Sequence, residues 1–203
     1  MCDMNAMPMG KTFAAMWILM MAVMMLPVLV PMLKHYREAI RERSASRRAI
    51  LTAIVSAGYF LVWTAASVPV VAAARAVAYV GMRQTLLGRF TPLAACAVVI
   101  AAGAWQFTAA KARQLGCCRE RPENGLPSDV RTAWRHGLRL GLRCVRCCAN
   151  LTAILLAVGV MDLVPMALVT AAISAERLAP AGERAARAIG VVAVVAGLML
   201  AAG

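Results

Sequence analysis

Cys144-Val145-Arg146-Cys147-Cys148 holds three of the seven cysteines of this 203-residue chain. The stretch lies where a basic, polar segment gives way to a long apolar run that extends from Ala149 to Ala175. On a helix, positions i, i+3 and i+4 share one face, so the three thiols are expected to point the same way. Such a cluster is a candidate site for a soft metal ion, although cysteine also packs well as a small apolar side chain. Both interpretations stay open on the spacing alone.

The composition predicts an integral membrane protein of the all-α, polytopic helical class. Hydrophobic residues make up 62% of the chain and the mean hydropathy is +0.73, whereas a soluble domain is about 45–50% apolar. The apolar residues occur in long runs separated by charged segments, which is typical of membrane spans. We expect a single domain over residues 1–203 with about six spans, five being the alternative. The expected spans cover residues 13–33, 49–74, 92–110, 140–159, 163–178 and 189–202.

The apolar run from Cys147 to Ala175 is longer than one span requires. As one helix it would be about 43 Å long, against a hydrocarbon core of about 30 Å. It would also place Asp162 in mid-membrane, where a charge is costly. A tight turn from Gly159, with Asp162 capping the next helix and Pro165 in its first turn, removes that cost. We therefore expect two spans here.

The distribution of basic residues predicts the orientation. The net charge is +13, and with six spans the loops 34–48, 111–146 and 177–187 carry 18 of the 22 Lys and Arg residues on one side. With five spans the split is weaker, 15 against seven. Basic loops stay in the cytoplasm, so the prediction is a multi-pass protein of the bacterial inner (plasma) membrane with its N-terminus outside. The arginines would also contact anionic lipid, and no interleaved aromatic residues indicate nucleic acid.

The first expected span is rich in methionine. Met16, Met20 and Met24 are spaced i, i+4, i+8 and form one stripe, and Met21 and Met25 form a second pair beside it. Thioethers are soft ligands suited to Cu(I), and methionine is also ordinary filler at helix interfaces. The spacing leaves a metal relay and core packing equally open.

Several motifs follow one another in a characteristic order. They are Met20-Met21-Ala22-Val23-Met24-Met25-Leu26-Pro27, Gly58-Tyr59-Phe60-Leu61-Val62-Trp63, Trp105-Gln106 followed by Lys111 and Cys118-Arg119, Gly141-Leu142-Arg143-Cys144-Val145-Arg146-Cys147-Cys148, Gly159-Val160-Met161-Asp162 with Met166, and Ala175-Glu176-Arg177. Through them the chain resembles, from Ala15 to Pro180, a bacterial family of predicted metal-binding integral membrane proteins of unknown function, sometimes labelled copper chaperones. The resemblance implies metal binding and suggests copper, and it implies no reaction. The chain departs from the family at Gln114, where a further cysteine is usual, and the nearby Cys117 is the candidate to replace it.

The leading hypothesis is therefore a membrane protein that binds Cu(I) and passes it on. Its thiol site at the cytoplasmic face would consist of Cys144, Cys147, Cys148 and Cys118, with Cys117 as a further candidate. A softer thioether route through the bilayer would consist of Met20, Met24, Met161 and Met166. Cu(I) is favoured over Zn(II), which usually takes four ligands, often including His, because the nearest histidine is His136. A copper-donating or copper-accepting protein is the expected partner.

Two other functions compete with this hypothesis. Cys144-x-x-Cys147 has the spacing of a redox dithiol, which would suit a membrane thiol-disulfide oxidoreductase. The predicted cytoplasmic location is reducing, which argues against it. Alternatively, the cysteines only pack, in a structural or assembly protein. The sequence contains no evident Ser/His/Asp triad, paired carboxylates or phosphate-binding glycine loop, so we do not expect an enzyme.

Overall fold

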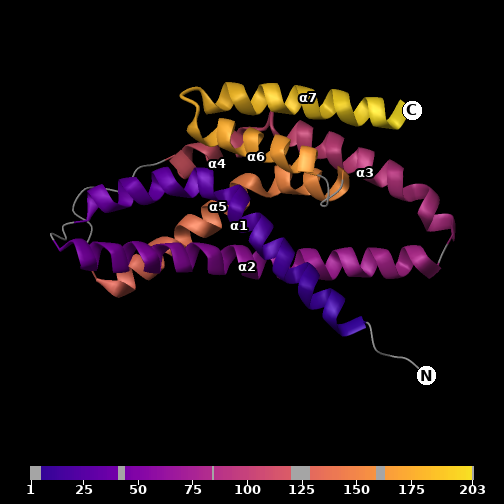
Figure 1. The fold of residues 1–203 in the computed structure, drawn as a ribbon. Coiled ribbons are helices and arrows are strands. Elements are labelled where there is room, and N and C mark those ends of the chain that lie inside the picture. Colours follow the sequence, from indigo (N-terminus) through magenta and orange to yellow (C-terminus); the bar gives the residue numbers. More distant parts are fainter. Residues whose placement is uncertain (1–5, 41–43, 84, 120–128, 159–162, 203) are drawn as a thin grey trace.

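Helices account for almost all of the chain that the structure describes. The structure is a computed structural model, and it describes residues 6–40, 44–83, 85–119, 129–158 and 163–202. The helices in these ranges are α1 (Ala6–Ala39), α2 (Ala45–Arg83), α3 (Thr85–Trp105), α4 (Ala109–Arg119), α5 (Val130–Val158), α6 (Leu163–Leu178) and α7 (Gly182–Ala202) (Figure 1). No strand occurs in the described ranges, and the predicted all-α class is confirmed.

Four of the helices are long and apolar enough to cross a membrane. These segments are Leu19–Ala39, Ala45–Val70, Val130–Val158 and Gly182–Ala202. Leu93–Trp105 and Ala109–Cys118 pass the same test only as a pair, bent by 69°, which gives five spans if the pair counts as one. By length and composition the described helices thus give four spans, or five with the bent pair, where about six were expected. Helix α6 makes the difference, because its 16 residues span only about 24 Å.

The helix boundaries refine the expected ones. Residues 111–119, which were assigned to a polar loop, belong to α4, and the helix that contains the expected span 140–159 begins at Val130. Asp129 caps α5 by accepting a hydrogen bond of 2.9 Å from the Thr132 backbone N–H, and these contacts with Thr132 hold the pKa of the Asp129 carboxyl below its usual value. The described part of α5 ends at Val158 and α6 begins at Leu163, with Pro165 in its first turn. Gly159 and Asp162 lie outside the described residues.

Helices α2 and α5 pack closely because glycines line their contact. Gly137 and Gly141, one turn apart on α5, face the backbone of α2. A Cβ atom on Gly141 would lie 2.8 Å from the Val62 Cβ atom and 3.0 Å from the Tyr59 carbonyl oxygen. Small residues at this spacing let two helices approach more closely than larger side chains would allow. This contact through Gly137 and Gly141, which we call the glycine seam, therefore holds α2 against the face of α5 that carries the cysteines.

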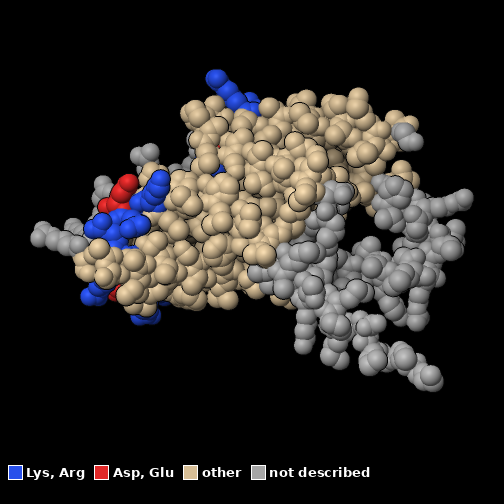
Figure 2. All heavy atoms as spheres, viewed as in Figure 1, with Lys and Arg blue, Asp and Glu red and all other residues tan. Residues whose placement is uncertain are grey.

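Charged and apolar side chains are segregated on the surface. On the face shown in Figure 2, Lys and Arg gather mainly at the end where α1 ends and α2 and α5 begin, and most of the remaining described surface carries no charge. Large apolar side chains such as Leu163 and Met199 are more than two-thirds exposed, at 79% and 71%. An exposed apolar surface of this extent is compatible with a membrane protein.

Candidate metal centre

Four cysteine thiols gather inside the helical bundle. Cys144, Cys147 and Cys148 lie on the buried face of α5, and Cys118 reaches the same core from α4. Each of the four residues is at most 4% exposed, and all are free thiols. The i, i+3, i+4 spacing thus places three thiols on one helical face, as the sequence predicts.

Two of the four thiols lie close enough to share one metal ion. The Sγ atoms of Cys144 and Cys148 lie 3.9 Å apart, and Cys147 and Cys118 belong to the same buried core cluster. The Cys118 thiol donates a hydrogen bond of 3.1 Å to the Arg143 carbonyl. With metal–sulfur bonds of about 2.3 Å, as in zinc thiolates, two sulfurs up to about 4.6 Å apart can bind one ion. Within the described ranges, however, no three Cys, His, Asp or Glu side chains are already grouped as a metal site. The arrangement therefore fits an ion that accepts two thiolates better than one that needs four ligands.

Tyr59 adds a hydroxyl group to this cluster from α2. Its side chain is fully buried, and its Oη atom lies 3.1 Å from the Sγ atom of Cys144. The glycine seam explains the contact, because Gly141 lies against the Tyr59 backbone less than one turn before Cys144. Tyr59 was not predicted as a site residue from the sequence. The only feature that pointed to it was its place in one of the family motifs.

A buried ion pair lies beside the thiols. The Nζ atom of Lys111 on α4 lies 2.7 Å from the Oε2 atom of Glu176 on α6, and both side chains are at most 2% exposed. Gln106 donates a hydrogen bond of 2.5 Å to the other oxygen of Glu176. Lys111 also donates to the Cys147 carbonyl at 2.8 Å and to the Asn150 side chain at 3.2 Å. The pair thus holds α4 and α6 to the turn of α5 that carries Cys147. The sequence analysis counted Lys111 only as a loop charge and did not predict this role.

Arg177 is the second buried cation near the cluster. It is 5% exposed, and its Nη2 atom donates to the Met32 thioether at 3.4 Å and to the Cys118 carbonyl at 3.5 Å. The guanidinium group also interacts electrostatically with all four thiols. The thiols therefore have a fixed positive charge next to them.

The other residues that the sequence predicted as metal ligands do not all lie in the thiol cluster. Cys117 is exposed on the surface of α4, so the structure does not bring it into the cluster. Met24 is buried in the same apolar core as the thiols, and Met20 and Met166 pack against that core. Met161 lies outside the described residues. The His136 ring stacks on Tyr36 with ring centroids 5.1 Å apart, and Tyr36 belongs to a separate core cluster.

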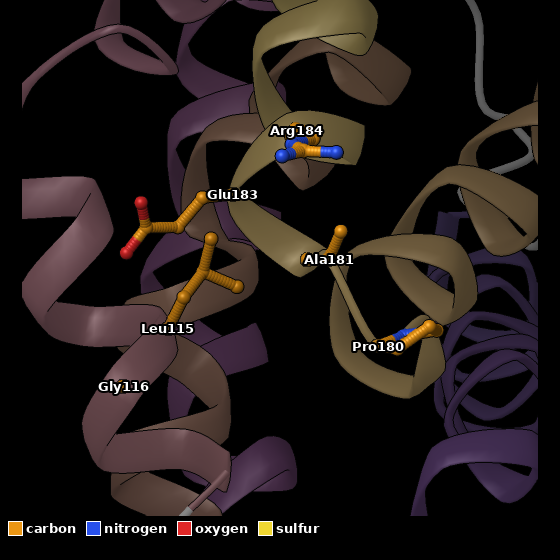
Figure 3. A pocket seen from close by; sticks show the side chains of 7 residues that line it. Leu115, Gly116, Pro180, Ala181, Glu183 and Arg184 are labelled. Atoms are coloured by element: carbon orange, nitrogen blue, oxygen red, sulfur yellow. The ribbon is translucent and has the colours of Figure 1, made fainter.

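A surface pocket of about 310 Å³ lies between α4 and the turn that joins α6 to α7 (Figure 3). Leu115 and Gly116 form its α4 side, and Glu183 and Arg184 lie on the opposite side. Cys117 follows Gly116 directly in the sequence, so this pocket and the exposed thiol occupy the same part of α4. The described lining provides one carboxylate and one guanidinium group but no thiol, which separates the pocket from the cysteine cluster.

A comparison with known families is consistent with the thiol cluster. The family model PpoB2, described as a copper chaperone, matches residues 14–200. Neither a curated protein nor a solved structure matches the chain. The match covers nearly the whole chain and confirms the resemblance that the motifs indicated. The chain therefore belongs to the PpoB2 copper chaperone family.

Proposed function

We propose that the protein binds Cu(I) at its thiol cluster and exchanges it with another copper protein. The observation that carries the proposal is the presence of four buried, free thiols from two helices in one core cluster, in a chain of a copper chaperone family. Thiolates bind soft ions tightly and lose a proton on binding, whereas thioethers bind them weakly without losing one. Cysteine and methionine together suit binding followed by release.

Cu(I) is the ion that these ligands favour. The Cys144 and Cys148 thiols, whose Sγ atoms lie 3.9 Å apart, can hold an ion that accepts two sulfurs. Zn(II) usually takes four ligands and often includes histidine, and His136 stacks on Tyr36 in place of joining the thiols. Zn(II) is therefore the less favoured cargo.

The proposed location is the inner membrane of a bacterium, with several membrane passes and the N-terminus outside. Four or five apolar segments of sufficient length support membrane insertion. The C-terminal end of α1 and the N-terminal ends of α2 and α5 lie together at the basic end of the molecule. This arrangement supports a cytoplasmic location for the loops at that end. In that orientation the thiols lie toward the cytoplasmic side, where they stay reduced, and lipid covers the apolar surface.

Methionines would provide the softer part of the route. Met24 lies in the same core as the cysteines, and Met20 and Met166 pack on it, so thioethers from α1 and α6 surround the thiols. Met161 would extend this set. We propose that Cu(I) exchanges between these thioethers and the thiolates.

We propose a metal-binding protein rather than an enzyme. A thiol-disulfide oxidoreductase needs a thiol that a partner's disulfide can reach, whereas Cys144 and Cys147 are at most 1% exposed. The thiol that contacts Cys144 at 3.9 Å is also that of Cys148, whereas a redox motif would use the Cys144-x-x-Cys147 pair.

Metal analysis of the purified protein under reducing conditions tests the proposal. The parent should retain copper, and the Cys144/Cys147/Cys148→Ser variant should lose it. Cys96→Ser is the matched control, because Cys96 is also a buried free thiol but belongs to α3, outside the cluster. Equal Cu(I) affinity of parent and triple variant would show that the cysteines only pack. A mixed disulfide trapped with a substrate protein would favour the oxidoreductase.

A further inference from the structure

Arg177 is buried without a full set of partners. It is 5% exposed, and its Nε and Nη1 atoms have no hydrogen-bond partner among the described residues. Its remaining nitrogen contacts a thioether and a backbone carbonyl, neither of which carries a negative charge. Burying a cation without an opposite charge is costly, so such a group needs a counter-ion.

No carboxylate in the described ranges supplies that charge. The adjacent residue, Glu176, already pairs with Lys111 at 2.7 Å and accepts a hydrogen bond from Gln106. The groups next to Arg177 that can become anions are the cysteine thiols, because its Nη2 atom lies 3.5 Å from the carbonyl oxygen of Cys118, which shares one core cluster with the other three cysteines. The positive charge thus faces the thiol cluster.

We infer that Arg177 is the counter-ion of the loaded metal centre and selects a monovalent soft cation over a divalent one. The inference rests on the proposed function. Two thiolates and one monovalent ion carry one net negative charge, which one guanidinium balances. A divalent ion on the same two thiolates would be neutral and would leave Arg177 unbalanced. A divalent ion on three thiolates would also balance it, but no three ligands are grouped for this in the described ranges.

The contacts of Arg177 hold its charge in place. The Nη2 atom lies between Met32 on α1 and the Cys118 carbonyl on α4, while the side chain itself comes from α6. Three helices therefore determine where the guanidinium lies, and the charge cannot follow the ion when the ion leaves. Arg177 is in this sense a specificity-determining residue that need not bind the metal.

Two substitutions of Arg177 in the full chain test the inference. Arg177→Met keeps a long side chain without its charge, and Arg177→Lys keeps the charge. Affinities are measured by competition with chromophoric chelators for Cu(I), for Ag(I) as a redox-inert monovalent ion, and for Zn(II). Arg177→Met should weaken Cu(I) and Ag(I) binding by about a hundredfold or more, as expected for removing one partner of a buried charge pair. Zn(II) binding should change less, and Arg177→Lys should recover the monovalent affinities to within about tenfold of the parent.

The melting temperature of the metal-free protein separates charge balance from a structural role. Arg177→Met removes an unbalanced buried cation, so the metal-free variant should melt no lower than the parent. Arg184→Met, at an exposed arginine, is the control and should change nothing. Unchanged Cu(I) affinity in Arg177→Met would overturn the inference, as would an equal loss for all three ions together with a lower melting temperature. A parent that binds no Cu(I), or a triple Cys→Ser variant that binds it equally well, would instead remove the proposed function and this inference with it.

Discussion

The Oη atom of Tyr59 lies 3.1 Å from the Sγ atom of Cys144, across the glycine seam between α2 and α5. A hydroxyl group at this distance can donate a hydrogen bond to a thiolate, which favours the charged form that binds metal. The contact therefore joins the packing of the two helices to the chemistry of the cluster.

Tyr59→Phe should keep the ring and remove only this hydrogen bond. We expect the free energy of unfolding to fall by about 0.5–1.5 kcal/mol. The Cu(I) dissociation constant should rise by less than tenfold, about the equivalent of that energy. Unfolding in detergent and chelator competition measure the two effects. Tyr36→Phe is the control, because the Tyr36 hydroxyl is buried with no partner in the described ranges and its removal should cost little. Complete loss of copper from Tyr59→Phe would instead identify the phenol as a ligand.

Gly141→Ala should open the seam between α2 and α5. The added Cβ atom would lie 2.8 Å from the Val62 Cβ atom and 3.0 Å from a backbone oxygen, so one helix must move. Overpacking of this kind costs about 1–3 kcal/mol. Gly116→Ala is the matched control, since its Cβ atom would meet nothing within 4 Å and alanine favours the helix. Equal stability of the two variants, measured by thermal unfolding, would show that the seam tolerates a wider spacing.

Lys111 and Glu176 should behave as a coupled pair. Lys111→Met leaves the Glu176 carboxylate buried without its cation, and loss of one partner of a buried pair costs about 3–5 kcal/mol. Lys111→Met combined with Glu176→Leu should be less destabilising than the sum of the two single variants. A double-mutant cycle of unfolding free energies measures the coupling, and additive effects would argue against it.

Cys117 reports the orientation of the protein in the membrane. It is exposed, whereas the four cluster cysteines are buried, so a maleimide should label it first. In a Cys2→Ser background, an impermeant maleimide should leave intact cells unlabelled and should label inside-out vesicles. Cys117→Ser should abolish that signal. Strong labelling of Cys117 from outside the cell would invert the proposed topology.

Met24→Leu should affect the movement of copper more than its binding. The two side chains have similar volumes, so the substitution should cost less than about 1.5 kcal/mol of stability at this buried site. Copper content should stay close to that of the parent, while transfer to an acceptor chelator should slow. Met199→Leu, at a position that is 71% exposed on α7, provides the control. Identical transfer rates for both variants would assign Met24 to core packing.

The periodic features of the site could be predicted from the sequence, because they depend on one helix alone. The spacing of Cys144, Cys147 and Cys148 places them on one face whatever surrounds the helix. The break after Val158 followed from the length of the apolar run and from the cost of a charge inside it. Neither feature depends on the neighbouring helices.

The features that depend on tertiary contacts could not be predicted. Cys117 and Cys118 are adjacent, and which of them faces the core depends on the 69° bend that orients α4. Lys111 and Glu176 lie 65 positions apart, and the sequence showed Lys111 only as a basic loop residue and Glu176 only as part of a family motif.

Cys118 is the one thiol of the cluster that α5 does not carry. An ion shared by Cys118 and Cys147 would be a reversible cross-link between α4 and α5. By analogy with a disulfide, closing a loop of about 30 residues restricts the unfolded chain by roughly 3–4 kcal/mol. The cargo would then be part of what fastens the two helices together, and delivering it would leave behind a protein that unfolds more readily than the one that received it.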